Sequence, residues 1–241
     1  MRVALCGRNL DELKRILADF PVRVDASAPD VVISYGGDGA LLGAERAFPG
    51  LPKCPIRDRS TSPKCPEHGE EHVIAQLVAG ELAETHLIKL EARTSTDTSV
   101  VGINDVVISK RNIASAVRCR LWLGDELYKN QIVGDGLVIA TPFGSTGYYR
   151  SITHSLFRVG IGLAFNNSTE PLDHLVIADE TGVTVEVIRG PAVLLADNDP
   201  ARISLDEGDC IRVARMRTGT VVLGLDIFRC PVCCRLRQED A

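Results

Sequence analysis

The chain has 241 residues, of which 45% are hydrophobic and 24% are charged, and its formal net charge is −5. This composition is ordinary for a globular protein with a sizeable core, and the length suits one large or two small domains. The negative charge argues against non-specific nucleic-acid binding, and no apolar run reaches the length of a membrane span. Because the N-terminus carries no signal-peptide pattern, a cytoplasmic location is expected.

The first part of the chain alternates between strand and helix patterns. A short apolar strand over residues 2–6 precedes a helix over 10–20 with apolar residues at helical spacing, and another strand covers 31–35. This alternation predicts a parallel α/β domain, in which ligands bind at the carboxyl ends of the strands. The stretch 51–69 is rich in Pro, Lys, Cys and Ser, and we predict a loop there.

A glycine-rich turn, Gly36-Gly37-Asp38-Gly39, follows the strand at 31–35 and precedes a helix pattern. Glycines let the backbone approach a bulky anion, and the start of a helix offers N–H groups to it. A carboxylate repels phosphate, so Asp38 is expected either to bind a metal ion or to take a proton from an attacking hydroxyl. A glycine turn with a solvated aspartate is the simpler alternative.

From about residue 85 the pattern changes to short strands separated by Gly, Asp and Asn turns. This pattern predicts an all-β second domain of layered or sandwich type, so we expect an α/β domain over 1–86 and a β domain over 87–241. The expected strands of this second part are 85–93, 101–109, 116–123, 137–141, 175–178, 183–188, 193–196, 210–214 and 220–227.

Two polar segments interrupt these strands. Asn104 and Asp105 sit inside an apolar run, where buried polar groups need partners, although a turn at the strand end is the alternative. The segment 134–151 runs from a strand into a glycine loop that is rich in hydroxyl groups. Hydroxyls and loop N–H groups suit a ribose or phosphate ligand, whereas ordinary helix caps are the alternative.

Together, these motifs resemble those of NAD kinases, which phosphorylate the adenosine 2′-hydroxyl of NAD. Residues 36–39 resemble the GGDG motif, Asn104-Asp105 resembles the NE/D motif, and 134–151 resembles the segment containing TPTGSTAY. The resemblance implies a Rossmann-like N-terminal α/β domain, a β-sandwich C-terminal domain that binds NAD, and a ligand cleft between them. It also implies ATP or polyphosphate as the donor, Mg²⁺ as the cofactor, and a homodimer or homotetramer.

The resemblance also implies roles for single residues. Asp38 would be the general base on the 2′-hydroxyl, and Asp135 would contact the nicotinamide end of NAD. Asn104 and Asp105 would contact its ribose and adenine side, and Tyr148 would stack on the ligand or close the site. The expected nucleotide- and substrate-binding residues are Gly36, Gly37, Gly39, Asn104, Asp105, Asp135, Thr141, Ser145, Thr146, Gly147, Tyr148, Ser151 and Asp197.

The chain departs from the family pattern in one segment above all. The family's glycine-rich stretch ending in LGFL is replaced by residues 55–69, and that stretch normally adjoins the ligand cleft. A kinase of the same fold acting on another nucleoside or nucleotide, or a non-catalytic NAD(P) sensor, are therefore the alternatives. Arg57 and Arg59 in this segment either meet phosphates or belong to a solvated basic loop.

The cysteines indicate a second hypothesis that is independent of the family. Cys65-Pro66-Glu67-His68 and Cys230-Pro231-Val232-Cys233 both have the spacing of a metal knuckle. Cys65, His68, Cys230 and Cys233 could complete a tetrahedral zinc site that joins the atypical loop to the C-terminal segment. Scattered thiols on a loop and a tail are the alternative.

Overall fold

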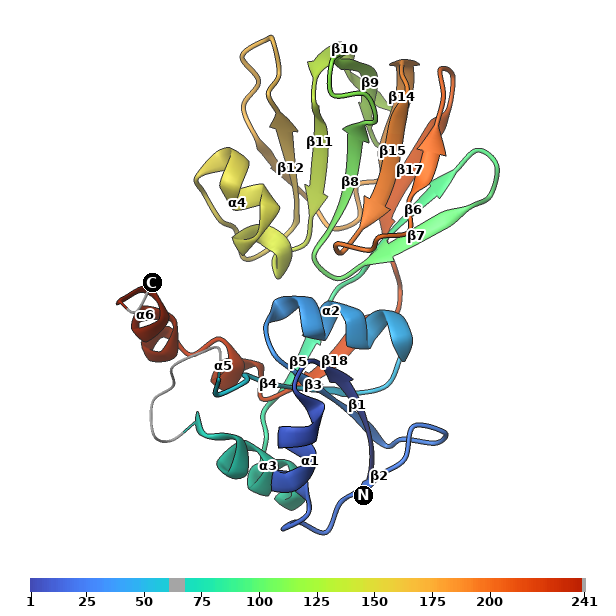
Figure 1. Ribbon diagram of the computed structural model, residues 1–241. Helices are drawn as coiled ribbons and strands as arrows, with labels where there is room; N and C mark the ends of the chain where they lie inside the picture. The colour runs from blue at the N-terminus through green and yellow to red at the C-terminus, as the bar shows by residue number, and fades with distance from the viewer. Residues whose placement is uncertain (61–67, 240–241) are drawn as a thin grey trace. The chain divides into compact units, whose positions relative to one another are not determined.

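The computed structural model describes residues 1–60 and 68–239 and divides the chain into two compact units (Figure 1). The first unit consists of Met1–Leu87 and Gly219–Ala241, and the second of Ile88–Thr218. The expected β domain over 87–241 is therefore wrong for the segment from Gly219 onward. That segment belongs to the first unit because its strand pairs with two strands of the N-terminal sheet.

The first unit is built on one six-stranded sheet with the order β2-β1-β3-β4-β18-β5. All its pairings are parallel except that of β18 with β5. The strands are β1 (Arg2–Gly7), β2 (Arg23–Val24), β3 (Val31–Tyr35), β4 (Lys53–Ile56), β5 (Glu84–Leu87) and β18 (Thr220–Leu223). The helices are α1 (Leu10–Leu17), α2 (Asp38–Ala47), α3 (Glu70–Ala79), α5 (Leu225–Phe228) and α6 (Pro231–Glu239).

The helices cover both faces of this sheet. Leu13 and Leu17 of α1 and Val73 and Leu77 of α3 pack into one apolar cluster with β1, β3 and β4. A second cluster, which includes Ala44 of α2, lies against β1 and β3 on the other face. Burying both faces of a parallel sheet is the arrangement expected of α/β units, so this part of the fold prediction is confirmed.

Strand β4 lies inside the stretch that was predicted to be a loop, and that part of the prediction is wrong. All four residues of β4 are buried, and the strand pairs with β3. Pro55 argued against a central strand because proline cannot donate to a ladder. The strand tolerates Pro55 because β18 pairs with β4 at Lys53. The N–H group that Pro55 lacks therefore falls at a position where β18 no longer pairs with β4.

The second unit consists of two antiparallel six-stranded sheets, ordered β10-β9-β14-β17-β6-β7 and β13-β12-β11-β8-β15-β16. Their strands are β6 (Leu90–Thr94), β7 (Ser99–Gly102), β8 (Asp105–Lys110), β9 (Val117–Leu123), β10 (Glu126–Gly134), β11 (Gly136–Ala140), β12 (Ile161–Asn166), β13 (Leu175–Ile177), β14 (Val183–Arg189), β15 (Ala192–Ala196), β16 (Ile203–Leu205) and β17 (Cys210–Arg215). A 3₁₀ turn η2 (Gly144–Thr146) and helix α4 (Tyr148–Thr153) follow β11.

One apolar core lies between these two sheets. Leu121 and Val185 come from one sheet, Ile108 and Leu163 come from the other, and all are fully buried in the same cluster. The β-sandwich prediction is thereby confirmed. The single strand expected over 101–109 is two strands, β7 and β8, separated by a turn at residues 103–104.

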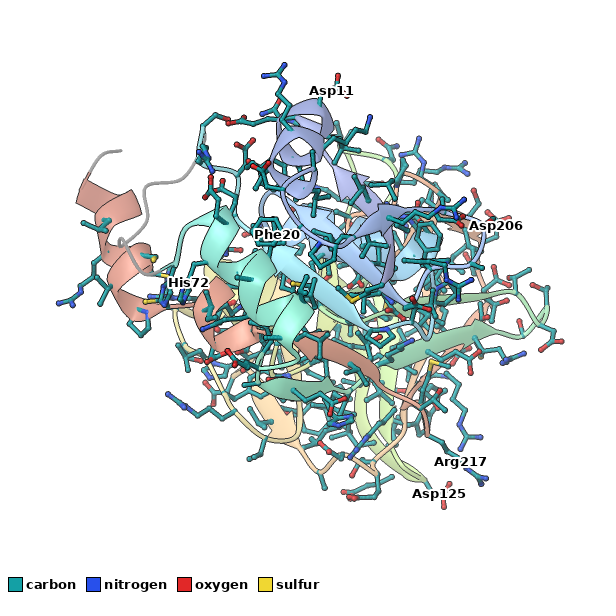
Figure 2. The ribbon with its side chains drawn as sticks, turned by 90° about the horizontal axis from the view of Figure 1, so that it is seen from below. Asp11, Phe20, His72, Asp125, Asp206 and Arg217 are labelled. Atoms are coloured by element: carbon teal, nitrogen blue, oxygen red, sulfur yellow. The ribbon has the colours of Figure 1, made fainter. Side chains whose placement is uncertain are left out.

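Charged side chains such as Asp11, Asp125 and Arg217 extend outward, whereas Phe20 turns toward the core of the first unit (Figure 2). None of the described helices is long and apolar enough to cross a lipid bilayer.

Candidate functional site

The glycine turn of the first unit lies at the carboxyl end of β3. Gly36 has φ 137°, a conformation that side chains rarely adopt, and its N–H donates to the Ile56 carbonyl at 2.8 Å. Gly37 caps helix α2, and Asp38 is its first residue. The sequence predicted this order of strand, turn and helix, and the turn places Asp38 in the first turn of the helix.

Two arginines hold the Asp38 carboxylate. Arg57 Nη2 lies 3.1 Å from Asp38 Oδ1, and Arg229 Nη2 lies 3.3 Å from Asp38 Oδ2. The Arg57 guanidinium also lies 3.8 Å from the centroid of the Phe228 ring and donates from Nε to the Phe228 carbonyl at 3.3 Å. Burial lowers the pKa of Arg229, and Asp38 acts against that shift. Two cationic groups therefore gather at the turn where an anion was expected.

Arg59, the other arginine of the atypical segment 55–69, binds Glu70 of α3. Its Nε lies 3.2 Å from Glu70 Oε2, and its backbone N–H donates to Glu70 Oε1 at 2.8 Å. Nearby, Asn9 Nδ2 donates to Asp58 Oδ2 at 2.6 Å. These contacts fix residues 57–60 to α3 and to the start of α1. They position Arg57 and leave Arg59 as an anchor rather than a phosphate ligand.

In the second unit, Asp197 organises the turn between β7 and β8. Its carboxylate accepts the backbone N–H groups of Ile103 at 2.7 Å, Asn104 at 2.7 Å and Asp105 at 3.2 Å. A Cβ on Gly102 would lie 2.8 Å from Asp197 Oδ1, so a side chain there would disturb the arrangement. These contacts favour a positioning role for Asp197, which was expected to lie near the ligand.

The turn presents two polar groups that internal contacts do not explain. Asp105 is 6% exposed, and burial together with the neighbouring Asp197 raises the pKa of its carboxyl to about 7. Asn104 Oδ1 is buried and has no hydrogen-bond partner among the described residues. Unsatisfied buried polar atoms and shifted carboxyl groups gather at ligand sites, so this pair is the strongest candidate in the second unit.

Two of the predicted hydroxyl ligands are buried and used internally. Thr141 is fully buried, and its Oγ1 donates to the Ile103 carbonyl at 2.5 Å. Ser145 is also buried, and its Oγ lies 2.8 Å from the Pro142 carbonyl and 3.0 Å from the Phe157 carbonyl. Both hydroxyls therefore hold the loop in shape, and neither is presented to a ligand in this arrangement.

Exposed groups of the same loop lie around a hollow of about 430 Å³. Tyr148, Ser151 and Asn166 are among its lining residues, and Asn166 Nδ2 donates to the Tyr148 hydroxyl at 2.8 Å. Thr146 is exposed as well, and the Thr146 and Ser151 hydroxyls each donate to a backbone carbonyl of the loop, at 3.4 and 2.7 Å. Gly147 precedes α4 as its N-terminal cap. This side of the loop is available to a small polar ligand.

Asp135 is paired rather than isolated. Asn167 Nδ2 donates to Asp135 Oδ2 at 2.8 Å, and Lys110 Nζ lies 2.6 Å from Asp135 Oδ1. The hydrogen bond from Asn167, followed by that from Lys110, lowers the pKa of the Asp135 carboxyl. Sequence analysis missed Lys110, Asn167 and Arg229, because none of them stands inside a motif.

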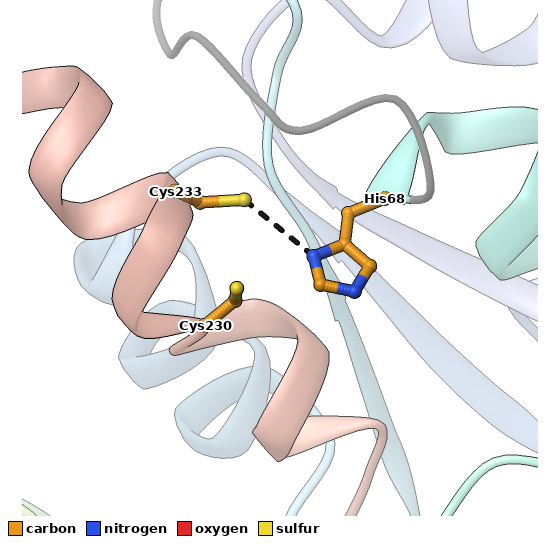
Figure 3. A group of neighbouring side chains, drawn as sticks. All are labelled: His68, Cys230 and Cys233. Carbon is orange, nitrogen blue, oxygen red and sulfur yellow. Dashed lines mark hydrogen bonds between the residues drawn. The ribbon is translucent and has the colours of Figure 1, made fainter.

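The predicted metal ligands come together in part. His68, Cys230 and Cys233 form a group whose ligand atoms all lie within 4.8 Å of one another (Figure 3). The fourth predicted ligand, Cys65, lies outside the described residues.

Comparison with known proteins gives consistent matches. A family model of the ATP-NAD kinase C-terminal domain matches residues 103–223, which is half of the chain. An NAD kinase of Methylibium petroleiphilum is 30% identical over 202 residues, covering 77% of this chain and 67% of the relative. An NAD kinase of Delftia acidovorans is 29% identical over 217 residues, covering 83% of this chain and 72% of the relative.

Solved structures of the same fold include a yeast NADH kinase complexed with NADH and an NAD kinase from Archaeoglobus fulgidus in complex with ATP. The yeast structure has a TM-score of 0.80 at 15% identity and covers 92% of this chain and 83% of its own. The archaeal structure has a TM-score of 0.75 at 18% identity and covers 96% of this chain and 97% of its own. With the family model on half of its length and curated relatives over most of it, this chain belongs to the NAD kinase family.

Proposed function

We propose that this protein transfers the terminal phosphate of ATP to the 2′-hydroxyl of the adenosine ribose of NAD, giving NADP. The observation that carries the proposal is the position of Asp38 at the first residue of α2, directly after the glycine turn. A carboxylate at a phosphate-binding turn has little use in binding phosphate and a clear use in accepting a proton.

The reaction then follows from the groups in the first unit. The ribose 2′-oxygen forms a bond to the terminal phosphorus of ATP, the bond from that phosphorus to the bridging oxygen breaks, and ADP leaves. Asp38 receives the hydroxyl proton. Phosphoryl transfer asks for alignment and charge neutralisation more than covalent help, and Gly36, Gly37 and Gly39 keep this approach open.

Arg57 and Arg229 could bind the negatively charged phosphates of ATP. Guanidinium groups bind phosphate oxygens in the same fork geometry with which they bind carboxylates. Arg57 and Arg229 rest on Asp38 at 3.1 and 3.3 Å. We infer that bound ATP draws at least one of them onto its phosphates, which leaves an Asp38 oxygen open to the hydroxyl proton.

We assign recognition of NAD to the second unit. The unsatisfied Asn104 Oδ1 and the buried Asp105 carboxyl are suited to the hydroxyls and amino group of an adenosine. Tyr148 and Ser151 line the neighbouring hollow, and Asp135 stays charged beside Lys110. Thr146 and Gly147 complete this side of the proposed site.

The family implies Mg²⁺, which binds the phosphate oxygens of a donor such as ATP. Among the described residues, the only group of three or more metal-ligating side chains is the one formed by His68, Cys230 and Cys233. A Mg²⁺ ion would therefore be held mainly by phosphate oxygens and water, as it commonly is, with Asp38 as the nearest carboxylate of the turn. Bound in that way, it would neutralise charge on the donor phosphates.

The test is NADP formation from NAD, ATP and Mg²⁺ with the wild type and Asp38→Asn. The variant keeps the size and polarity of the side chain and removes its basicity, so we expect a loss of about 10²- to 10⁴-fold in kcat. Asp11→Asn, an exposed aspartate on α1, is the matched control and should keep full activity. An Asp38→Asn enzyme that folds normally and keeps more than about a tenth of the rate would contradict the assignment.

The acceptor and donor are tested in the same assay. NADH, other nucleosides and nucleotides replace NAD in parallel arms, and polyphosphate replaces ATP, with ADP release as the general readout in the ATP arms. Turnover of another acceptor in preference to NAD would identify a kinase of the same fold with a different substrate. Binding of NAD without turnover of any acceptor would favour a sensor. Light scattering tests the homodimer or homotetramer that the family implies.

A further inference from the structure

The group formed by His68, Cys230 and Cys233 has no role in the chemistry described above. We propose that these three residues bind a structural zinc ion that joins the segment before α3 to the start of α6. Two thiol groups and an imidazole are the ligand set that zinc prefers over magnesium or calcium.

The distances match a tetrahedral zinc site. Zn–S bonds of about 2.3 Å and Zn–N bonds of about 2.0–2.1 Å place a sulfur and a nitrogen ligand about 3.6 Å apart and two sulfurs about 3.8 Å apart. Cys233 Sγ lies 3.5 Å from His68 Nδ1, and all three ligand atoms lie within 4.8 Å of one another. A contraction of less than about 1 Å brings the group to ideal geometry.

The start of α6 suits metal-binding thiolates. Cys230 directly precedes the helix, which begins at Pro231, and the Cys234 N–H donates to the Cys230 carbonyl at 2.9 Å. Residues at i and i+3 share one face of a helical turn, and both sulfurs lie on the side that faces His68 (Figure 3). The two cysteines are 8% and 3% exposed, which shields the sulfurs from oxidants.

His68 supplies the third ligand from a distant part of the chain. It stands two residues before α3, and its Nδ1 faces Cys233 (Figure 3). The bond would connect residues 165 positions apart in the sequence. The fourth coordination position falls to a ligand outside this group of three, which water or a further side chain can fill.

The ion would stabilise the first unit at helix α6, where few apolar side chains are buried. Helix α6 contributes no residue to the main apolar cluster of this unit within the described residues. A metal bond across a long loop restricts the unfolded chain strongly, and its binding free energy adds to folding. The stabilising ion would thus fix the start of α6 against the segment leading to α3.

The experiment measures the metal content of the full chain, expressed with added zinc and purified without a polyhistidine tag. We expect about one equivalent of zinc in the wild type and in Cys234→Ser, the adjacent control cysteine that stands outside the group. Cys233→Ser and His68→Ala should each lose most of it. Wild-type protein with less than about a third of an equivalent, or a Cys233→Ser variant with wild-type zinc content, would overturn the proposal.

A second measurement keeps the proposal testable if the variants fold poorly. Zinc in the wild type is exchanged for Co²⁺, whose tetrahedral thiolate complexes absorb visible light strongly. Appearance of these bands, with thermal unfolding at lower temperature after metal removal, supports the site. Absence of the bands, or a disulfide between Cys230 and Cys233 in zinc-supplemented protein, would overturn it. Neither readout depends on kinase activity, so the two proposals fail separately.

Discussion

Arg57 binds Asp38 through a single guanidinium nitrogen, Nη2, which lies 3.1 Å from Oδ1 while the same group stacks on the Phe228 ring. The arginine is held from behind by an aromatic ring and by a backbone carbonyl of the C-terminal segment. The Arg57 guanidinium therefore faces the turn that carries Asp38, although Arg57 stands in a segment without a family motif.

Replacing Arg57 tests whether this charge serves the donor. Arg57→Ala should lower kcat/KM for ATP by about 10- to 100-fold, because a charge-assisted hydrogen bond contributes about 1.5–3 kcal/mol. Arg57→Lys should recover part of the loss, since it keeps the charge without the fork. Arg15→Ala, which removes an exposed arginine of α1, is the matched control. Equal effects of the Arg57 and Arg15 changes on ATP kinetics would refute a direct role.

The Asp105 carboxyl should make the stability of the second unit depend on pH. Folding raises its pKa from an ordinary value of 3.8 to about 7, so between these values the folded protein keeps a proton that the unfolded chain has lost. Stability therefore falls as the pH rises through this window, by up to about 1.4 kcal/mol per pH unit relative to Asp105→Asn. Urea unfolding followed by the fluorescence of Trp122, the single tryptophan, measures this directly.

The control for that experiment is Asp125→Asn, an exposed aspartate of the same unit. Its stability curve should run parallel to that of the wild type at every pH. If the Asp105→Asn curve also runs parallel from pH about 4 to 7, the buried carboxyl is not the titrating group.

Asp197→Ala should destabilise the second unit. The substitution removes the acceptor of three backbone N–H groups at residues 103–105 and leaves them buried. A cost of about 3 kcal/mol or more is expected, since each unsatisfied buried donor costs about 1–3 kcal/mol. Asp199→Ala, two residues further on, removes one such contact and should cost less. Similar shifts of the Trp122 unfolding midpoint in both variants would contradict the positioning role.

A buried ion pair gives a separate prediction for the first unit. Lys53 Nζ lies 2.5 Å from Glu45 Oε2, and both side chains are buried. Glu45→Gln leaves the lysine charge without its counterion and should lower the free energy of unfolding by about 3–5 kcal/mol. Asp11→Asn, which removes an exposed partner of Lys14, should leave stability unchanged. Circular dichroism melts of both variants test the contrast.

The parts of the fold that sequence analysis predicted well are those whose signal is local. Residues 31–35 form a strand of the expected length because five consecutive apolar or small residues are buried on both faces. The turn at 36–39 follows from a glycine that must adopt positive φ. Strand β4 was missed because Pro55 and the polar residues around it indicate a loop. The four residues of β4 are buried only because the strand pairs within the sheet, which the local sequence does not show.

The residues of the candidate site also differ in whether a local motif reveals them. Asp38, Asn104 and Asp105 stand in motifs with a chemical interpretation, and the sequence could single them out. The roles of Thr141 and Ser145 depend on which carbonyls surround their hydroxyls, and composition alone cannot distinguish a ligand from a cap. Arg229 reaches Asp38 across 191 positions of sequence, a contact that only the pairing of β18 with the N-terminal sheet creates.

That pairing has a consequence for biosynthesis. Strand β18 lies between β4 and β5 in the sheet order, yet it is made after the whole second unit. On the ribosome, β5 has no neighbour in its own sheet until the segment from Gly219 has emerged, whereas residues 88–218 already hold every strand of their sandwich. The second unit should therefore fold first, while residues 1–87 still lack strand β18 of their sheet. Residues 1–87 expressed alone should therefore aggregate, because β5 lacks its partner strand, and a chain that joins 219–241 to residue 87 should aggregate less when both are compared by light scattering.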